Sequence, residues 1–235
     1  MHTSESKGKW GILDVLLVLG FIFILTNVFT WLTAGLIEGL VITQKYLIST
    51  MFQTTAVILA LVYFNIIKGV TWKEIGIRAG NLTRILTHGI FGGIILFGLV
   101  VFAGLIMELI LPVKPSLQPF AKLVLEAQGY NDLIILLIIG AILAPIGEEI
   151  YFRGMVYPVF KKKWGLAAGM IVSGIFFALL HFDILRFFPL LLGGIGLAYI
   201  YEKSGSLFAC MLAHGLWNGV MILLLYFSTG QSTGL

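Results

Sequence analysis

The sequence predicts an all-α, polytopic membrane protein built as a bundle of about seven membrane-spanning helices. Of its 235 residues, 59% are hydrophobic before glycine is counted, and only 11% carry a charge. Soluble domains are roughly 45–50% apolar with glycine included and about 25% charged. A water-soluble domain could not bury so much apolar surface, so the composition excludes a soluble enzyme, a disordered protein and a nucleic-acid-binding module.

Seven apolar stretches follow one another along the chain. A spanning helix needs about 20 residues, so roughly six to eight spans fit this length, and we treat residues 1–235 as a single transmembrane domain. Backbone polar groups inside a bilayer must be satisfied within the segment, which makes each stretch a helix. The expected helices are Ile12–Leu36, Tyr46–Ile67, Ile85–Leu111, Leu133–Tyr157, Leu166–His181, Phe187–Tyr201 and Leu207–Phe227.

Lysine and arginine residues predict the orientation of these spans. Ten of them fall in the N-terminal tail or in the connections on the same side, and four fall on the opposite side. Cytoplasmic loops carry an excess of these residues, so we expect a cytoplasmic N-terminus and an external C-terminus.

Two connecting segments have a predicted structure of their own. Thr71 and Glu74 open the segment Thr71–Ala79 with a capping box, and this segment is either a helix on the membrane surface or a solvated loop helix. The segment Pro112–Asp132 contains three prolines and is expected to be a structured outer loop with a short helix from Pro119 to Ala127.

The fourth stretch contains three ionisable residues close together, Glu148, Glu149 and Arg153. Such groups inside a span cost about 2.5–3.5 kcal/mol each on insertion scales, so they point to function. Glu149 and Arg153 are four residues apart on one helix face and are predicted to pair. Glu148 is rotated by about 100° from Glu149, which leaves it unpaired and available. The aromatic and apolar residues that follow argue against a solvated helix end.

Polar residues in two other stretches are predicted to meet this group. Glu148 and His181 lie almost symmetrically about Trp164, so a hairpin of the fourth and fifth spans would place them at similar depth. His214 and Asn218 share one helix face of the seventh stretch. Counted from the same side, His214 lies about 12 Å and Glu148 about 13 Å along their helices. His181 lies deeper when it is counted from the start of its own stretch.

These side chains are suited to activating water against an amide bond. Glu148 would take a proton from the water and His181 would orient it. His214 and Asn218 would donate hydrogen bonds to the developing oxyanion. The single cysteine, Cys210, shares a face with His214 but lies between apolar neighbours, so covalent catalysis is disfavoured.

Three motifs in this half of the chain resemble those of the CAAX-protease and bacteriocin-processing family of intramembrane endopeptidases. This family is also called the abortive-infection or type II CAAX prenyl endopeptidase family. The motifs EExxxR, FxxxH and HxxxN correspond here to EEIYFRG (148–154), FALLH (177–181) and HGLWN (214–218). The resemblance covers about 133–227, which would be the catalytic core. It implies a helical membrane protease with the catalytic residues Glu148, Glu149, Arg153, His181, His214 and Asn218.

The resemblance also implies substrates and a location. Members cut lipidated proteins near the C-terminus, or process peptides in bacterial relatives, so we expect a peptide or lipidated-protein substrate and no nucleic acid. The short loops and the family suggest a multi-pass protein of a bacterial plasma membrane.

A zinc site built from Glu148, His181 and His214 is the alternative to a metal-free site, since two His and a Glu can bind zinc with an open position. The motif HExxH is absent, and a zinc-bound Glu148 could not also act as the base. Because Glu149 is committed to Arg153, we expect no metal.

Two other classes of function remain open at this stage. A proton-coupled transporter could use Glu148, Glu149 and Arg153 as a relay, although the inverted repeat that would support it is not visible. A non-catalytic scaffold or immunity protein would only bind a partner. The glycines of this chain are predicted to be close-packing positions rather than phosphate loops, and they are Gly92, Gly93, Gly193, Gly194 and Gly196.

Overall fold

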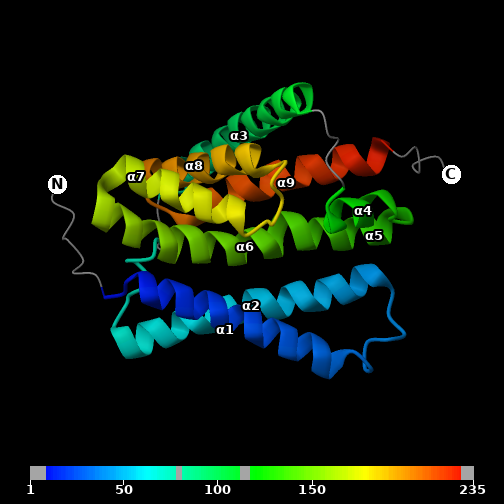
Figure 1. Ribbon diagram of the computed structural model, residues 1–235, viewed down its shortest axis with the longest axis horizontal. Coiled ribbons are helices and arrows are strands. Elements are labelled where there is room, and N and C mark those ends of the chain that lie inside the picture. Colours follow the sequence, from blue (N-terminus) through cyan, green and yellow to red (C-terminus); the bar gives the residue numbers. More distant parts are fainter. Residues whose placement is uncertain (1–8, 78–80, 112–116, 229–235) are drawn as a thin grey trace.

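The computed structural model describes residues 9–77, 81–111 and 117–228. Within these ranges every regular element is a helix, which confirms the predicted all-α class (Figure 1). The first helices are α1 (Ile12–Thr33), α2 (Ile42–Lys68), α3 (Leu82–Ile110) and the short α4 (Pro119–Leu125). The others are α5 (Gly129–Leu137), the π-helix η1 (Ile138–Leu143), α6 (Ala144–Glu149), the π-helix η2 (Ile150–Val156), α7 (Tyr157–Leu179), α8 (Phe187–Ser204) and α9 (Leu207–Ser228).

Five helical segments are long and apolar enough to cross a membrane, which supports a multi-pass membrane protein. They are Ile12–Thr33, Ile42–Lys68, Leu82–Ile110, Gly129–Leu179 and Leu207–Ser228. The fourth has 51 residues because it contains both the fourth and the fifth predicted spans. Its two arms meet at Gly165, whose backbone (φ 84°, ψ 179°) suits glycine and turns the chain back on itself as the predicted hairpin (Figure 1).

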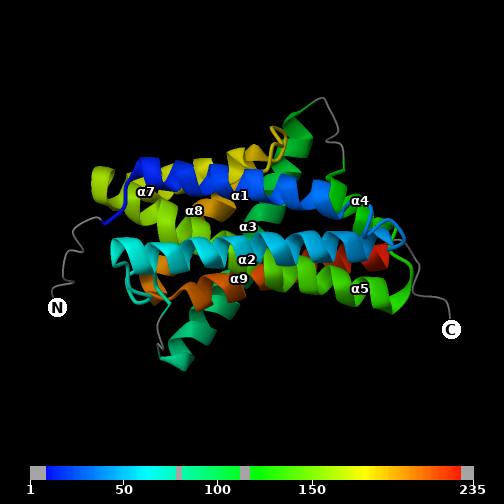
Figure 2. The same ribbon diagram turned by 90° about the horizontal axis from the view of Figure 1, so that it is seen from below.

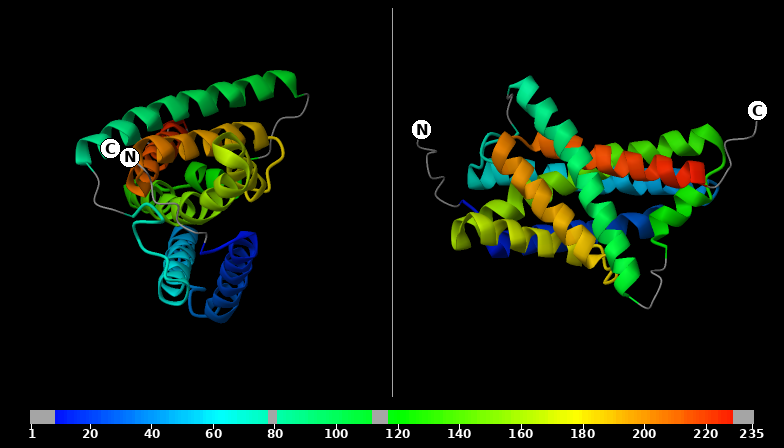
Figure 3. Two further views of the ribbon diagram at one scale, coloured as in Figure 1. Left: turned by 90° about the vertical axis from the view of Figure 1, so that its left-hand side faces the viewer. Right: turned by 90° about the horizontal axis from the view of Figure 1, so that it is seen from above.

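The helices form two unequal parts. α1 and α2 make a pair on one side of the molecule, and the long arm from α5 to α7 lies between this pair and the remaining helices (Figures 1 and 2). On the far side α3 crosses α8 and α9 obliquely and packs on both (Figure 3). The long arm is therefore the element that contacts both parts.

Glycines allow the close crossings on the α3, α8 and α9 side. A Cβ atom at any of the five predicted close-packing glycines would lie 2.2–2.9 Å from an atom of a neighbouring helix. Helices in lipid approach closely through such small residues, so the predicted packing role of these glycines is confirmed.

The connection after α2 differs from both predicted alternatives. The capping box forms, because the Thr71 amide and hydroxyl donate to Glu74 at 2.6 and 2.9 Å. The hydrogen bond from the Thr71 backbone holds the pKa of Glu74 below its usual range. However, residues 71–77 form a compact turn rather than a helix, and Ile75 is buried in the core. Arg78 and Ala79 lie outside the described residues.

The contact between α9 and η1 gives a test of this packing. A Cβ atom at Gly215 would lie 2.3 Å from the backbone oxygen of Ala141, whereas one at Gly219 would lie 3.5 Å from the Ala141 side chain. We expect Gly215→Ala to lower the free energy of unfolding by about 1–3 kcal/mol through overpacking. Gly219→Ala should be neutral or stabilising by about 0.5–1 kcal/mol, because alanine favours a helix. Unfolding of both purified variants in detergent measures the difference, and equal stabilities would contradict the close contact.

Candidate active site

A buried ion pair lies at the centre of the long arm. The side chains of Glu149 and Arg153 are fully buried, and Arg153 Nη1 donates to Glu149 Oε1 at 2.9 Å. Arg153 Nη2 donates to the carbonyl of Gly194 on α8, also at 2.9 Å. The guanidinium lies 5.0 Å from the ring centre of Phe177. The pair predicted from the spacing of four residues is therefore present, and it also ties the arm to α8.

The same carboxylate holds a histidine from another helix. His214 Nδ1 on α9 lies 2.8 Å from Glu149 Oε1, and the imidazole is almost fully buried and stacks on Trp217. With its Nδ1–H donated to Glu149, the other ring nitrogen of a neutral His214 is left as an acceptor. This Nε2 lies 3.9 Å from Glu148 Oε2, beyond hydrogen-bond distance. Glu149 therefore sets both the position and the tautomer of His214.

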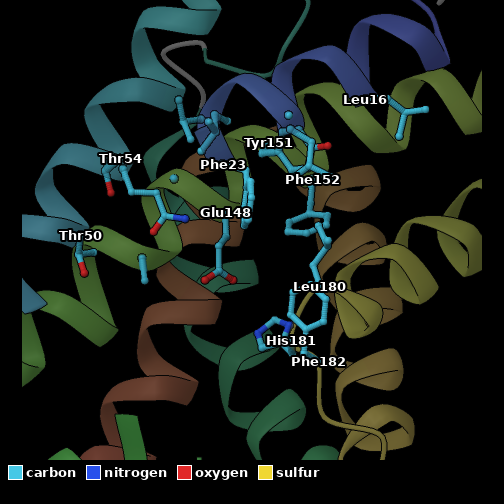
Figure 4. A pocket seen from close by; sticks show the side chains of 17 residues that line it. Leu16, Phe23, Thr50, Thr54, Glu148, Tyr151, Phe152, Leu180, His181 and Phe182 are labelled. Atoms are coloured by element: carbon cyan, nitrogen blue, oxygen red, sulfur yellow. The ribbon is translucent and has the colours of Figure 1, made fainter. Parts of the chain in front are cut away.

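Glu148 is the carboxylate that remains free. Its side chain is 33% exposed and points into a cavity (Figure 4). Among the described residues its Oε2 has no hydrogen-bond partner. Two adjacent glutamates thus have different surroundings, as their helix phases predict.

His181 faces the same cavity from the other arm of the hairpin (Figure 4). α7 ends at Leu179, so His181 lies in the turn that follows and not within the helix. Its Nδ1 lies 2.8 Å from the carbonyl of Phe177, and the Phe177 ring contacts both His181 and His214. The arm after Gly165 ends at Leu179 and is shorter than the arm before it. His181, at the end of the shorter arm, therefore lines the same cavity as Glu148 in the middle of the longer arm.

The cavity has a volume of about 610 Å³ and lies between α1, α2, α6, η2 and the turn 180–182. Glu148 and His181 line it, but His214 and Asn218 are not among its lining residues. His214 lies behind Glu148, and the Asn218 amide donates to the carbonyl of Gly140 at 2.9 Å. Glu148 and His181 therefore share the cavity, whereas His214 and Asn218, which were predicted to meet them, lie outside its lining.

Two π-helical segments flank the glutamates, and the sequence analysis did not anticipate them. In a π-helix the hydrogen bonds shift by one residue, which leaves carbonyl groups for other partners. Gly140 accepts from Asn218, and Leu143 accepts from the Thr54 hydroxyl of α2 at 3.0 Å. The available signal was Pro145 and Pro158, since each follows one π segment and lacks a backbone N–H.

The zinc alternative requires Glu148, His181 and His214 to be grouped around one ion. Within residues 9–77, 81–111 and 117–228, no three His, Cys, Asp or Glu side chains are grouped as metal ligands. The bond of His214 Nδ1 to Glu149 leaves its Nε2 open, but among the described residues His181 is not grouped with Glu148 and His214 as a third ligand.

Residues 130–220 match the family model described as type II CAAX prenyl endopeptidase Rce1-like. This match confirms the resemblance drawn from the three motifs, and it includes all six candidate site residues. Helices α1, α2 and α3 lie outside the matched stretch.

Two curated proteins are similar to a part of the chain. "Putative membrane peptidase YdiL" of Bacillus subtilis (strain 168) is 22% identical over 90 residues, which are 38% of this chain and 37% of that protein. "Uncharacterized 24.3 kDa protein" of Escherichia coli is 28% identical over 102 residues, 41% of this chain and 47% of that protein. The chain thus matches less than half the length of these relatives. No solved structure matches it.

The buried pair predicts a large cost for removing its cation. Arg153→Ala leaves the buried Glu149 charge with His214 alone, and breaking a buried pair costs about 3–5 kcal/mol. Lys161→Ala is the matched control. Lys161 forms an ion pair with Glu202 in which both side chains are partly exposed, so this pair should contribute at most about 1 kcal/mol. Denaturant unfolding in detergent measures both, and an Arg153→Ala protein as stable as the Lys161→Ala control would contradict the central role of the pair.

Proposed function

We propose that this protein is a membrane-embedded endopeptidase of the CAAX-protease type that hydrolyses a peptide bond with water activated by Glu148. The observation that carries the proposal is the division of labour between two adjacent carboxylates. Glu149 is bonded to Arg153 and His214, whereas Glu148 is unpaired in a cavity that also contains His181. The match to a membrane peptidase family supports this reading of the cavity.

In the proposed reaction Glu148 takes a proton from a water molecule held between it and His181. The hydroxide attacks the carbonyl carbon of the scissile bond, and the electron pair of that carbonyl moves onto its oxygen. His214, which Glu149 holds behind Glu148 with its Nε2 3.9 Å from Glu148 Oε2, positions the base in this proposal. Glu148 then passes its proton to the leaving nitrogen as the carbon–nitrogen bond breaks, which regenerates the carboxylate.

Three further residues act by position in this proposal. Arg153 donates to Glu149 and holds it in place, so that Glu149 can orient His214. Asn218, whose amide is bonded to Gly140, holds α9 against η1 and thereby fixes the height of His214 beside Glu148. The oxyanion contact predicted for Asn218 would use its remaining amide hydrogen.

The substrate and location remain as inferred from the sequence. We propose a peptide or a lipidated protein cut near its C-terminus, within the plasma membrane of a bacterium, by a protein whose N-terminus is cytoplasmic. The lysine and arginine distribution supports the orientation. The family resemblance supports bacteriocin processing or abortive infection as the biological setting.

Replacement of the free carboxylate tests the proposed base. Glu148→Gln should fold with normal stability, because it removes no hydrogen bond, and should lose roughly 10²-fold or more of the activity, as expected for a general base. Glu108→Gln, on an exposed position of α3, is the matched control. Comparative proteomics of membranes with wild-type and Glu148→Gln protein should identify cleaved substrates, and release of peptide by purified protein should confirm them.

The same experiment separates the other classes of function. A scaffold would keep its cellular effect in Glu148→Gln at normal expression. A carrier would lose transport without any difference in cleaved peptides. A fully active Glu148→Gln protein would show that the base is misassigned.

Metal removal tests the chemistry of the site. We expect activity to survive exhaustive chelation, and purified active protein to hold no stoichiometric zinc, because Glu148 cannot be both a free base and a metal ligand. The measurements are peptide release after chelation and elemental analysis of the active fraction. Loss of activity that is restored by about one equivalent of zinc would overturn the metal-free mechanism.

A further inference from the structure

The cavity contains polar groups that the proposed reaction does not use. Its described lining includes six polar side chains, which are Thr50, Gln53, Thr54, Glu148, Tyr151 and His181. Two are already bonded within the protein, since Thr54 donates to Leu143 and the Tyr151 hydroxyl donates to Val15 at 3.1 Å. Glu148 and His181 carry the proposed chemistry. Thr50 and Gln53 are left without an assigned role.

These two residues lie three positions apart on one face of α2, so their side chains are neighbours. Figure 4 shows Thr50 and Thr54 on the side of the cavity that flanks Glu148. Among the described residues neither Thr50 nor Gln53 makes a hydrogen bond, although nearby Thr55 donates to Met51 of its own helix at 2.8 Å. Gln53 is exposed and Thr50 is half-buried, so both side chains are open to a ligand in the cavity.

A peptide in this cavity needs such partners. The scissile bond must be unwound before water can attack it, and its main-chain N–H and C=O groups then lose their helical hydrogen bonds in an apolar setting. A glutamine carboxamide both donates and accepts, so it can satisfy one N–H and one C=O of an extended main chain. We propose that Gln53, assisted by Thr50, is the subsite that binds the substrate main chain beside Glu148. This inference rests on the proposed endopeptidase function.

The charges of the cavity define the class of substrate for this subsite. Glu148 is the one charged side chain in the described lining, which contains no Lys or Arg. A free carboxylate next to Glu148 would be repelled, and no cation there would offset the repulsion. The subsite therefore fits an uncharged, apolar stretch of polypeptide, and the C-terminal carboxylate of a substrate cut near its C-terminus would lie away from Glu148. Leu16 and Phe23 of α1 line the cavity and are also 47% and 67% exposed at the surface, so this stretch can enter from the bilayer.

A matched pair of variants tests the subsite. The probe is a quenched fluorescent peptide with a blocked C-terminus that contains a cleavage site found in the membrane proteomics, and the enzyme is the full chain in detergent. We expect Gln53→Met to raise KM about ten-fold with kcat little changed, because the lost hydrogen bonds hold the substrate before and during reaction. Gln44→Met changes the same residue type on the same helix but away from the cavity, and should leave both constants and the unfolding midpoint unchanged.

Chemical changes to the probe distinguish substrate binding by Gln53 from a purely structural role of this residue. N-methylation of the main-chain amide next to the scissile bond should weaken binding to the wild type but add little to the Gln53→Met defect. The subsite would be overturned if the effects of N-methylation and of Gln53→Met on KM were independent and multiplied. An unchanged KM in Gln53→Met would also overturn it. Equal cleavage of a probe whose free carboxylate belongs to the residue directly after the scissile bond would overturn the substrate class. If Glu148→Gln cleaves the probe as well as the wild type, the proposed function itself fails, which is a separate outcome.

Discussion

The arrangement of the site depends on one buried carboxylate. Glu149 binds Arg153 from its own helix and His214 from α9, and Arg153 in turn binds the backbone of α8. A buried charge is tolerated only with such partners, so the need to neutralise Glu149 brings three helices together at one depth. Its neighbour Glu148 then faces the cavity simply because it is one position earlier on the helix.

The π-helical segments on either side make this arrangement compatible with close packing. They free backbone carbonyls within the bundle, and side chains of α9 and α2 take them up: Asn218 binds Gly140 and Thr54 binds Leu143. Two helices that could slide along the arm are thereby fixed in register. Gly215 contributes by letting α9 approach the Ala141 backbone, where any larger residue would push His214 away from Glu149.

The cavity also depends on helices outside the matched family segment. α1 and α2 supply its second wall. The Tyr151 hydroxyl of the long arm donates to Val15 of α1, and Trp10, just before α1, donates to the carbonyl of Met155. Figure 3 shows this pair of helices as a separate layer beside the rest of the bundle, and many of its apolar side chains face outward. The catalytic groups and the wall that would select a substrate thus come from different halves of the chain.

The sequence by itself determined the helical class, the hairpin of the fourth and fifth spans, the Glu149–Arg153 pair and the free Glu148. These features follow from composition and from residue spacing along a single helix, which are local properties. Tertiary structure decided which side chains line the cavity, that Asn218 binds Gly140, and that Gln53 and Thr50 flank the site, because these depend on how separate helices pack. The π segments changed the phase and height of the long arm, so residue counting alone could not place His214 behind Glu148 and outside the cavity.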